Sequence, residues 1–398
     1  MIRNCSCLVA LARRWSLPCA LLVALLVGCV GPKAARAHTA ASATPGPPPA
    51  PDTTDAPIWE RLPLVGSDSA SNTSWYALPL MYYTPETSVG GGFSAGYFFG
   101  DDPTRISSVA ADLSATLFGE YQVSASTELY LNEGRYRLKG SANAARTPTS
   151  FFGVGPHTDA EDRESYTQQL VDVTLHGARR VSHALHLGLR TRVRHAAITT
   201  FPEDGLLDRH AVTGARGSTV LGIGPTLIVD DRSRTYYPSQ GHYVSMYALF
   251  HPHVEGAQGA FTRLVADFRR FTPLGGDHVL ALQAYGEATT GAAPFALLPK
   301  LGGSDRMRGY QNARFRDKVT ATAQAEWRFP VWGPVDGAAF ASVGSIAPEF
   351  SQLASTYLKP AGGIGMRYRL TDDGVHLRAD VAVSPDGTGI YLTGSQPF

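Results

Sequence analysis

The sequence predicts an all-β protein: a single transmembrane antiparallel β-barrel of about 16 strands. Charged residues make up only 17% of the 398 residues, against about 25% in soluble domains. The chain also contains 41 glycines and 10% aromatic residues. After residue 30 no apolar stretch is long enough for a membrane-spanning helix. From Trp75 onward, apolar and polar residues alternate over about 10 residues or more, the length of a tilted membrane strand.

Residues 1–37 are predicted to be a signal peptide. An apolar run, Leu17–Val30, follows two arginines and is too short to span a membrane. Cleavage is expected after Ala37, which ends an A-x-A sequence. The alternative is a lipoprotein signal, because the residues before Cys29 resemble a lipobox. Lipidation of Cys29 and cleavage after Ala37 are both open at this point.

Residues 38–73 are rich in Ala, Pro, Ser and Thr and are expected to form a periplasmic linker without a core.

All four cysteines lie in the first 29 residues, so the remainder has no disulfide framework and no thiolate metal site. Residues 1–37 hold five basic residues and no acidic one, which leaves 30 basic against 34 acidic residues and a net charge of −4. This charge excludes a nucleic-acid-binding protein.

Residues 74–398 are predicted to form the barrel. In the clearest segment, 319–329, every second residue from Val319 to Phe329 is apolar and the others are polar. Soluble strands average about 5–6 residues, whereas this length, with Trp327 and Phe329 at one end, matches a membrane strand with an aromatic girdle. The sixteen segments are 74–84, 88–100, 105–118, 120–131, 134–146, 164–180, 184–199, 218–231, 240–252, 259–272, 277–290, 318–330, 335–346, 361–371, 375–384 and 388–397.

The alternation also predicts which way side chains point. The side chains expected to face lipid are Trp327, Phe329, Leu377 and Val381, and those expected to face the lumen are Gln324, Glu326, Arg378 and Asp380. The four longest connections, 147–163, 200–217, 290–317 and 347–360, follow the fifth, seventh, eleventh and thirteenth segments. Long extracellular loops of a barrel follow odd strands, so the loop lengths support the strand count.

The chain ends in Phe398, behind an alternating segment that is expected to be the last strand. A C-terminal aromatic residue in this position is the signal that the barrel-assembly machinery reads in its clients. We therefore expect Phe398 to act as a C-terminal barrel signal and the protein to be folded by that machinery.

The connection between the eleventh and twelfth segments contains the tripeptide Arg308-Gly309-Tyr310 and is too long and too polar for a hairpin turn. Here the chain resembles the BamA/TamA-like family of outer-membrane assembly factors, also called bacterial surface antigens, whose hallmark is an Arg-Gly-Phe/Tyr tripeptide in the sixth extracellular loop. Further segments that resemble the family, in the same order, are 224–227, 230–232, 238–241, 326–330, 377–380 and 394–398. The resemblance implies that the long extracellular loop folds back into the lumen.

Two features depart from the family pattern. Members usually carry periplasmic POTRA modules of about 75 residues, whereas 38–73 has room for none, so the chain resembles a barrel-only branch lacking POTRA domains. The family also often has an Asp on the thirteenth strand that pairs with the loop arginine, and here that position is Ser342. A luminal arginine still needs acceptors. The candidate partners of Arg308 are Glu326, Asp380 and Ser342.

No pattern indicates an enzyme, a cofactor site or a metal site, and none of these is expected. His251 and His253 flank a proline without a third ligand in sequence, and the other histidines of the barrel, His176, His183, His186 and His195, show no catalytic spacing with a serine. The inward charges are expected to line a hydrated lumen rather than to perform chemistry; they are Glu326, Arg328, Arg367, Arg369, Arg378 and Asp380.

The resemblance implies a role in protein insertion or translocation at the bacterial outer membrane. According to this interpretation, a weak seam between the first and last strands pairs with a client strand. The loop around Arg308 then braces the side of the barrel wall that lies opposite the seam. The expected partners are outer-membrane lipid and client outer-membrane proteins, with oligomer formation open. The alternatives are a passive pore or channel and a structural surface-antigen barrel.

Overall fold

The computed structural model describes residues 65–68, 72–84, 88–102, 104–252, 259–353, 358–371, 374–394 and 396–398. The chain divides into residues 1–64 and Val65–Phe398, and all described residues belong to the second unit. The predictions for residues 1–37, including Cys29 and Ala37, and for most of 38–73 concern residues outside the described ranges. No helix in the described ranges is long and apolar enough to cross a membrane.

Sixteen long strands form the wall. They are β2 (Thr73–Thr84), β3 (Ser88–Phe99), β4 (Ser107–Thr116), β5 (Tyr121–Leu131), β6 (Tyr136–Phe151), β7 (Glu164–Arg180), β8 (Leu185–Thr200), β9 (Gly217–Asp230), β10 (Gly241–His251), β11 (Phe261–Gly275), β12 (His278–Gly291), β15 (Val319–Trp332), β16 (Val335–Ala347), β17 (Lys359–Arg369), β18 (His376–Ser384) and β19 (Gly387–Thr393). The smaller elements are β1 (Val65–Asp68), β13 (Lys300–Leu301), β14 (Phe315–Arg316) and the 3₁₀ turns η1 (Phe295–Leu297) and η2 (Phe350–Gln352).

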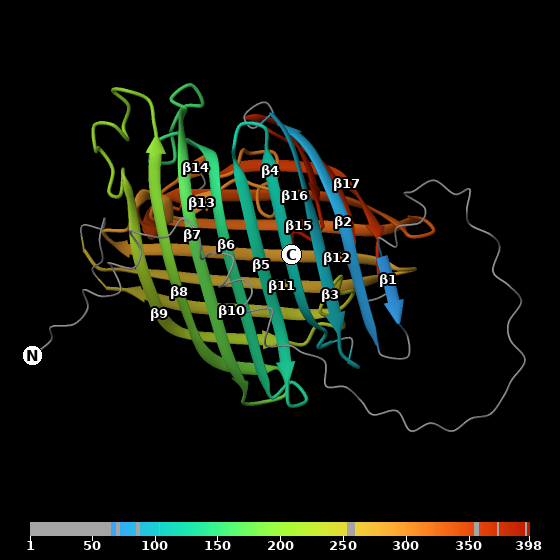
Figure 1. Ribbon diagram of the computed structural model, residues 1–398. Coiled ribbons are helices and arrows are strands. Elements are labelled where there is room, and N and C mark those ends of the chain that lie inside the picture. Colours follow the sequence, from blue (N-terminus) through green and yellow to red (C-terminus); the bar gives the residue numbers. More distant parts are fainter. Residues whose placement is uncertain are drawn as a thin grey trace, which may run out of the picture. The chain divides into compact units, whose positions relative to one another are not determined.

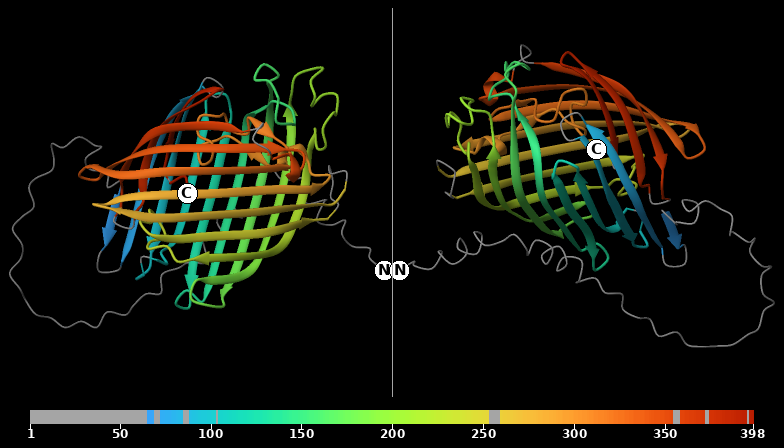
Figure 2. Two further views of the ribbon diagram at one scale, coloured as in Figure 1. Left: turned by 180° about the vertical axis from the view of Figure 1, so that it is seen from behind. Right: turned by 45° about the horizontal axis from the view of Figure 1, so that its top comes forward.

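The strands pair antiparallel with their neighbours in chain order from β1 to β12, β12 then pairs with β15, and the order continues to β19. The sheet rolls up into a barrel, with β3 to β9 on one side and β10 to β17 on the other (Figures 1 and 2). Strands β13 and β14 pair only with each other, in the long connection between β12 and β15. The predicted all-β barrel of about 16 strands is confirmed.

Each predicted segment corresponds to one wall strand, and the differences lie at the ends. Strand β6 continues to Phe151 rather than ending near 146, because its register with β7 runs on to Phe151 and Glu164. The last strand ends at Thr393 rather than 397, for reasons given below. The structure also has a short strand, β1, within the segment 38–73 that was expected to be a linker. It pairs with Thr73–Tyr76 of β2.

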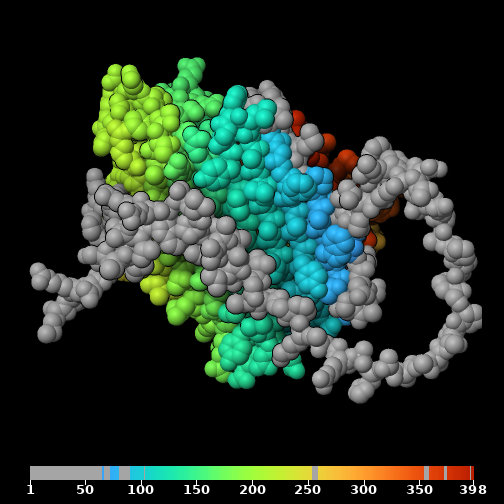
Figure 3. Space-filling model, in the orientation of Figure 1, coloured from blue at the N-terminus to red at the C-terminus, as the bar shows by residue number. Residues whose placement is uncertain are grey.

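The two faces of the wall are chemically distinct, as the alternation predicts. Trp327, Leu377 and Val381 are 44%, 39% and 46% exposed on the outer face, whereas Glu326 and Asp380 are 0% and 1% exposed on the luminal face. Figure 3 shows the outer surface over the cyan and green strands. Large apolar side chains such as Phe93 and Leu189 are more than half exposed there, as expected for a face covered by lipid in a barrel.

Candidate functional site

The connection between β12 and β15 packs against the inner wall. Its side chains Leu301, Met307 and Tyr310 are almost fully buried and form a cluster with Ile346 of β16 and Ala361 of β17. The right-hand view of Figure 2, with the top brought forward, shows this orange segment between the two sides of the barrel. We call residues 292–318 the luminal loop.

Gly309 allows the luminal loop to approach the wall closely. Its φ is +107°, a backbone conformation that favours glycine, and an added Cβ would lie 2.9 Å from the main-chain carbon of Val383. The Gly309 amide donates to the hydroxyl of Tyr391 at 2.9 Å, and Ser384 Oγ donates to the Gly309 carbonyl at 2.9 Å. The tripeptide is therefore anchored to β18 and β19 through its main chain.

The guanidinium of Arg308 lies between two carboxylates. Its Nη1 donates to Asp380 Oδ2 at 2.6 Å, and its Nη2 donates to Glu326 Oε2 at 2.9 Å. The Phe340 ring covers it, with the guanidinium carbon 3.4 Å from the ring centroid. Arg308 is 1% exposed. Burying a cation costs free energy unless it is paired and hydrogen-bonded, and the two carboxylates supply these partners here.

The wall register brings these partners together. Glu326 of β15 lies opposite Phe340 of β16, and Asp380 of β18 lies opposite Gly365 of β17. The side chains of Glu326, Phe340 and Asp380 point inward, because each residue lies at one of the alternate strand positions that face the lumen. Gly365 has no side chain, and a Cβ there would lie 1.9 Å from Asp380 Oδ1. The glycine therefore leaves the space that the carboxylate fills.

Three wall arginines complete the network. Arg367 donates to Asp380 Oδ1 at 2.5 Å and to Glu326 Oε2 at 3.0 Å, and Arg328 Nε donates to Glu326 Oε1 at 2.9 Å. Arg378 Nε lies 3.6 Å from Asp380 Oδ2. The side chains of this network are 0–2% exposed. We call Arg308, Glu326, Asp380, Arg328, Arg367 and Arg378 the ion-pair network.

The network differs from the sequence interpretation in two ways. Arg328, Arg367 and Arg378 are fully buried ion-pair partners and do not line a hydrated lumen, whereas Arg369 is exposed. The hydrogen-bond acceptors of Arg308 are Glu326 and Asp380, whereas Ser342 Oγ donates to the Ala361 carbonyl at 3.4 Å. The contact between the Phe340 ring and the Arg308 guanidinium was not predicted. The alternation of the strand indicates only that Phe340 points inward and cannot show which side chain packs against its ring.

Phe398 is not part of the last strand. It is 4% exposed and packs with Phe271, Val279 and Ala281, which are luminal residues of β11 and β12. Arg328 Nη2 donates to its main-chain oxygen at 3.1 Å. The chain therefore leaves the wall after Thr393 and turns into the lumen, because the aromatic ring gains a buried pocket there.

The histidines do not assemble a site among the described residues. His251 is buried and stacks on Phe261 with ring centroids 4.2 Å apart, and His253 lies outside the described residues. His176 and His186 are buried at inward positions, whereas His183 and His195 are exposed. The described ranges contain no group of three or more potential metal-binding side chains.

Comparisons with known proteins agree with this architecture. Two solved structures have the same fold: BamA from Haemophilus ducreyi lacking POTRA domains 1–3, at 12% identity and a TM-score of 0.52, and CdiB from Escherichia coli, at 11% identity and a TM-score of 0.51. The alignments cover 81% of this chain in both cases, 69% of the BamA chain and 62% of the CdiB chain. A comparison with curated proteins gave no significant match.

The family assignment comes from the sequence itself. Residues 86–392 match the Omp85 superfamily domain. This range includes nearly the whole wall, the luminal loop and the ion-pair network. The chain is thus a member of the Omp85 superfamily.

Proposed function

We propose that this protein inserts or translocates other proteins at the bacterial outer membrane. The observation that carries the proposal is the luminal loop, held by Arg308 between Glu326 and Asp380 in an Omp85 barrel. The loop is fixed to β15, β18 and β19, so it stiffens the side of the wall that leads to the last strand and not, as expected from the sequence, the wall opposite the seam. Deformation of the barrel is then concentrated where the wall is weaker.

The two ends of the sheet supply such a place. The last wall strand, β19, has seven residues, whereas the other fifteen wall strands have 9 to 17. The short strand β1 has only four. Strand β2 pairs along its whole length with β3, so β1 must occupy the opposite edge of β2, at Thr73–Tyr76. A client strand could pair with this edge of β2 once β1 leaves it, since free strand edges accept additional strands.

A passive channel is the second candidate. It is favoured by a cavity of about 560 Å³ on the luminal side, lined by charged and polar residues such as Asp112, Glu128 and Arg232. The two functions differ in what they require of the seam. Ion conduction needs only a path through the lumen, whereas client insertion needs a free edge of β2.

The test is reconstitution of the barrel in liposomes. The folding rate of an unfolded client barrel is measured beside the ion conductance of the same liposomes. In the double variant Ser67→Cys/Ser74→Cys, oxidation should fix β1 to β2, because these residues are directly opposed in the register. We expect oxidation to slow client folding severalfold and reduction to restore it, with conductance unchanged.

A wall crosslink provides the matched control. Ala111 and Ala125 are opposed on β4 and β5, so Ala111→Cys/Ala125→Cys introduces the same bond away from the seam. The chain has no cysteine beyond residue 29, so no other wall thiol competes. If the barrel does not accelerate client folding over empty liposomes but conducts ions, the channel replaces the insertion proposal.

A further inference from the structure

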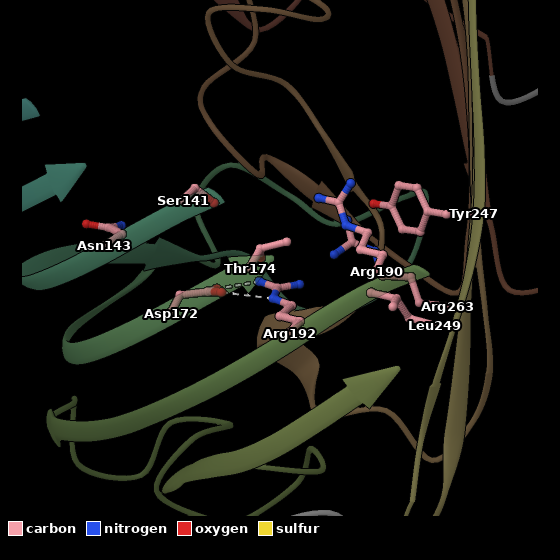
Figure 4. Close-up of a pocket in the computed structure, with 9 residues that line it drawn as sticks. All are labelled: Ser141, Asn143, Asp172, Thr174, Arg190, Arg192, Tyr247, Leu249 and Arg263. Atoms are coloured by element: carbon pink, nitrogen blue, oxygen red, sulfur yellow. Dashed lines mark hydrogen bonds and ion pairs between the residues drawn. The ribbon is translucent and has the colours of Figure 1, made fainter. Parts of the chain in front are cut away.

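A second cavity lies on the luminal side of β6 to β11, apart from the ion-pair network. Its volume is about 280 Å³, and its charged lining consists of Arg190, Arg192, Arg263 and one carboxylate, Asp172. Figure 4 shows Arg190 and Arg263 beside Tyr247, with Arg192 paired to Asp172 across neighbouring strands. The cavity is thus bordered by three guanidinium groups.

Further cations extend this lining toward the luminal loop. Arg194 follows Arg190 and Arg192 on the same face of β8, two residues apart each time. It interacts electrostatically with Arg192 below it and with Arg316 of the loop strand β14. Lys300 of β13 lies opposite Arg316 in the register and interacts with Arg194 and Arg263 as well.

The carboxylates near these cations are too few to balance them. Asp172 accepts two hydrogen bonds from Arg192, at 3.0 and 2.5 Å. Glu287 lies 2.9 Å from Arg263. The cations are Arg190, Arg192, Arg194, Arg263, Lys300 and Arg316. In the described part of the chain, the salt-bridge partners of these six cations are two carboxylates, Asp172 and Glu287, which leaves an excess of four positive charges.

Arg316 is the most revealing member, because its charge is buried without a hydrogen-bond partner. It is 1% exposed, and none of its three guanidinium nitrogens has a hydrogen-bond acceptor in the described part of the chain. Its nearest aromatic rings, Phe295 and Phe151, have centroids 5.6 and 5.9 Å from the guanidinium carbon. Such contacts compensate only part of the cost of burying a charge.

The main chain of Arg316 is nevertheless well fixed. Its carbonyl accepts a hydrogen bond from the Gly155 amide at 2.8 Å, and β14 pairs with β13. Nearby, Arg194 Nε also lacks a partner among the described residues. Lys300, which is exposed, adds a further positive charge opposite Arg316. The unused donors of Arg316 and Arg194 would be satisfied by an added anion.

We propose that this cationic cluster is a binding site for a small polyvalent oxyanion of the phosphate class. Guanidinium groups recognise such anions through paired N–H donors. The cavity lined by Arg190, Arg192 and Arg263 provides room. Arg194 and Arg316 lie outside its lining, but Arg194 interacts electrostatically with both Arg192 and Arg316, and the two side chains carry donors that the described part of the protein does not use. This site is separate from the ion-pair network and does not depend on the proposed insertion activity.

The test is calorimetric titration of the purified full-length protein in detergent with pyrophosphate, at constant ionic strength. Wild type should bind saturably. Arg316→Gln should weaken binding at least about tenfold, which corresponds to about 1.4 kcal/mol, and Arg194→Gln provides a second variant. Arg269→Gln is the matched control. It removes one luminal charge that is already paired with Asp267 at 2.7 Å, and it should change the affinity less than twofold.

Thermal unfolding separates a ligand site from a structural arginine. Pyrophosphate should raise the Tm of wild type and not that of Arg316→Gln, by mass action. Without the anion, Arg316→Gln should unfold at the same temperature as wild type or higher, because it removes an uncompensated charge. Loss of stability to the same extent with and without pyrophosphate would overturn the proposal. So would binding of an acidic peptide such as oligoglutamate in the absence of pyrophosphate binding.

Discussion

Arg308 shows how a single buried charge can position a loop. Its two terminal nitrogens each bind a different carboxylate, Glu326 and Asp380, from strands that are not neighbours. Ser342, where the resemblance led us to expect a carboxylate, is not its acceptor, and these two side chains accept its hydrogen bonds instead. A single arginine thereby connects the luminal loop with β15 and β18.

Removal of Arg308 should release the loop and leave the carboxylates without their central partner. We expect Arg308→Ala to lower the free energy of unfolding by about 3–5 kcal/mol, the cost of breaking a buried ion pair, and to raise the protease sensitivity of the luminal loop. Glu326→Gln should have a smaller effect in the same direction. The double variant should be less destabilised than the sum of the two, by about 0.5–3 kcal/mol in a double-mutant cycle. Additive effects would show that the two side chains act independently.

Gly309 should tolerate no side chain. Gly309→Ala places a Cβ 2.9 Å from the Val383 main chain at a φ of +107°, so we expect a loss of about 1–3 kcal/mol in urea titrations and a loosened loop. Gly286→Ala is the matched control, because its φ is not in the left-handed region and no atom lies within 4 Å of the added Cβ. If both variants are equally stable, the close approach of the tripeptide to β18 has no energetic importance.

At the level of the element, alternation was sufficient to predict the wall. A period of two fixes which side chains share a face, so the inward positions of Glu326 and Asp380 follow from β15 and β18 alone. The pairing of Arg367 with both carboxylates could not be predicted, because it depends on the register between β15, β17 and β18. The strand β1 was also missed, since four residues are too few to show a pattern.

The facing of the strands predicts unequal costs for the same substitution. Ala323→Lys places a charge on the outer face of β15, where it should cost about 2–4 kcal/mol in a bilayer. Ala110→Lys introduces the same charge on β4 beside the larger luminal cavity, near Asp112 and Glu128, and should cost less. Folding titrations into lipid vesicles compare the two variants. Equal costs would contradict the assignment of the outer face to lipid.

For the whole molecule, the parts that the sequence could not predict are contacts between distant segments. Phe398 lies against Phe271 and Val279, more than 100 residues earlier in the chain. The alternation of 388–397 predicts a strand to the end, and only the presence of this luminal pocket explains why β19 stops at Thr393. The cationic cluster is likewise assembled from β8, β11 and the luminal loop, so no local pattern indicates it.

The position of Phe398 allows its two expected roles to be separated. As a terminal signal it would act on the unfolded chain, whereas in the folded barrel it fills the pocket formed by Phe271, Val279 and Ala281. Phe398→Ala should therefore reduce both the amount of assembled barrel in cells and the stability of protein refolded in detergent. The second effect should be about 3–5 kcal/mol, the usual cost of removing a buried phenyl ring. Phe350→Ala, at a ring that is 79% exposed, is the control and should change neither.

Phe271→Ala distinguishes the two roles of Phe398 further. It enlarges the pocket without altering the C-terminus, so it should destabilise the refolded barrel while the terminal signal stays intact. If Phe271→Ala lowers assembly in cells as much as Phe398→Ala does, stability alone accounts for the defect. If assembly falls only in Phe398→Ala at comparable stability, the terminal residue is read before the barrel closes over it. Heat-modifiable migration of the folded barrel on gels measures assembly, and urea titration measures stability in the same variants.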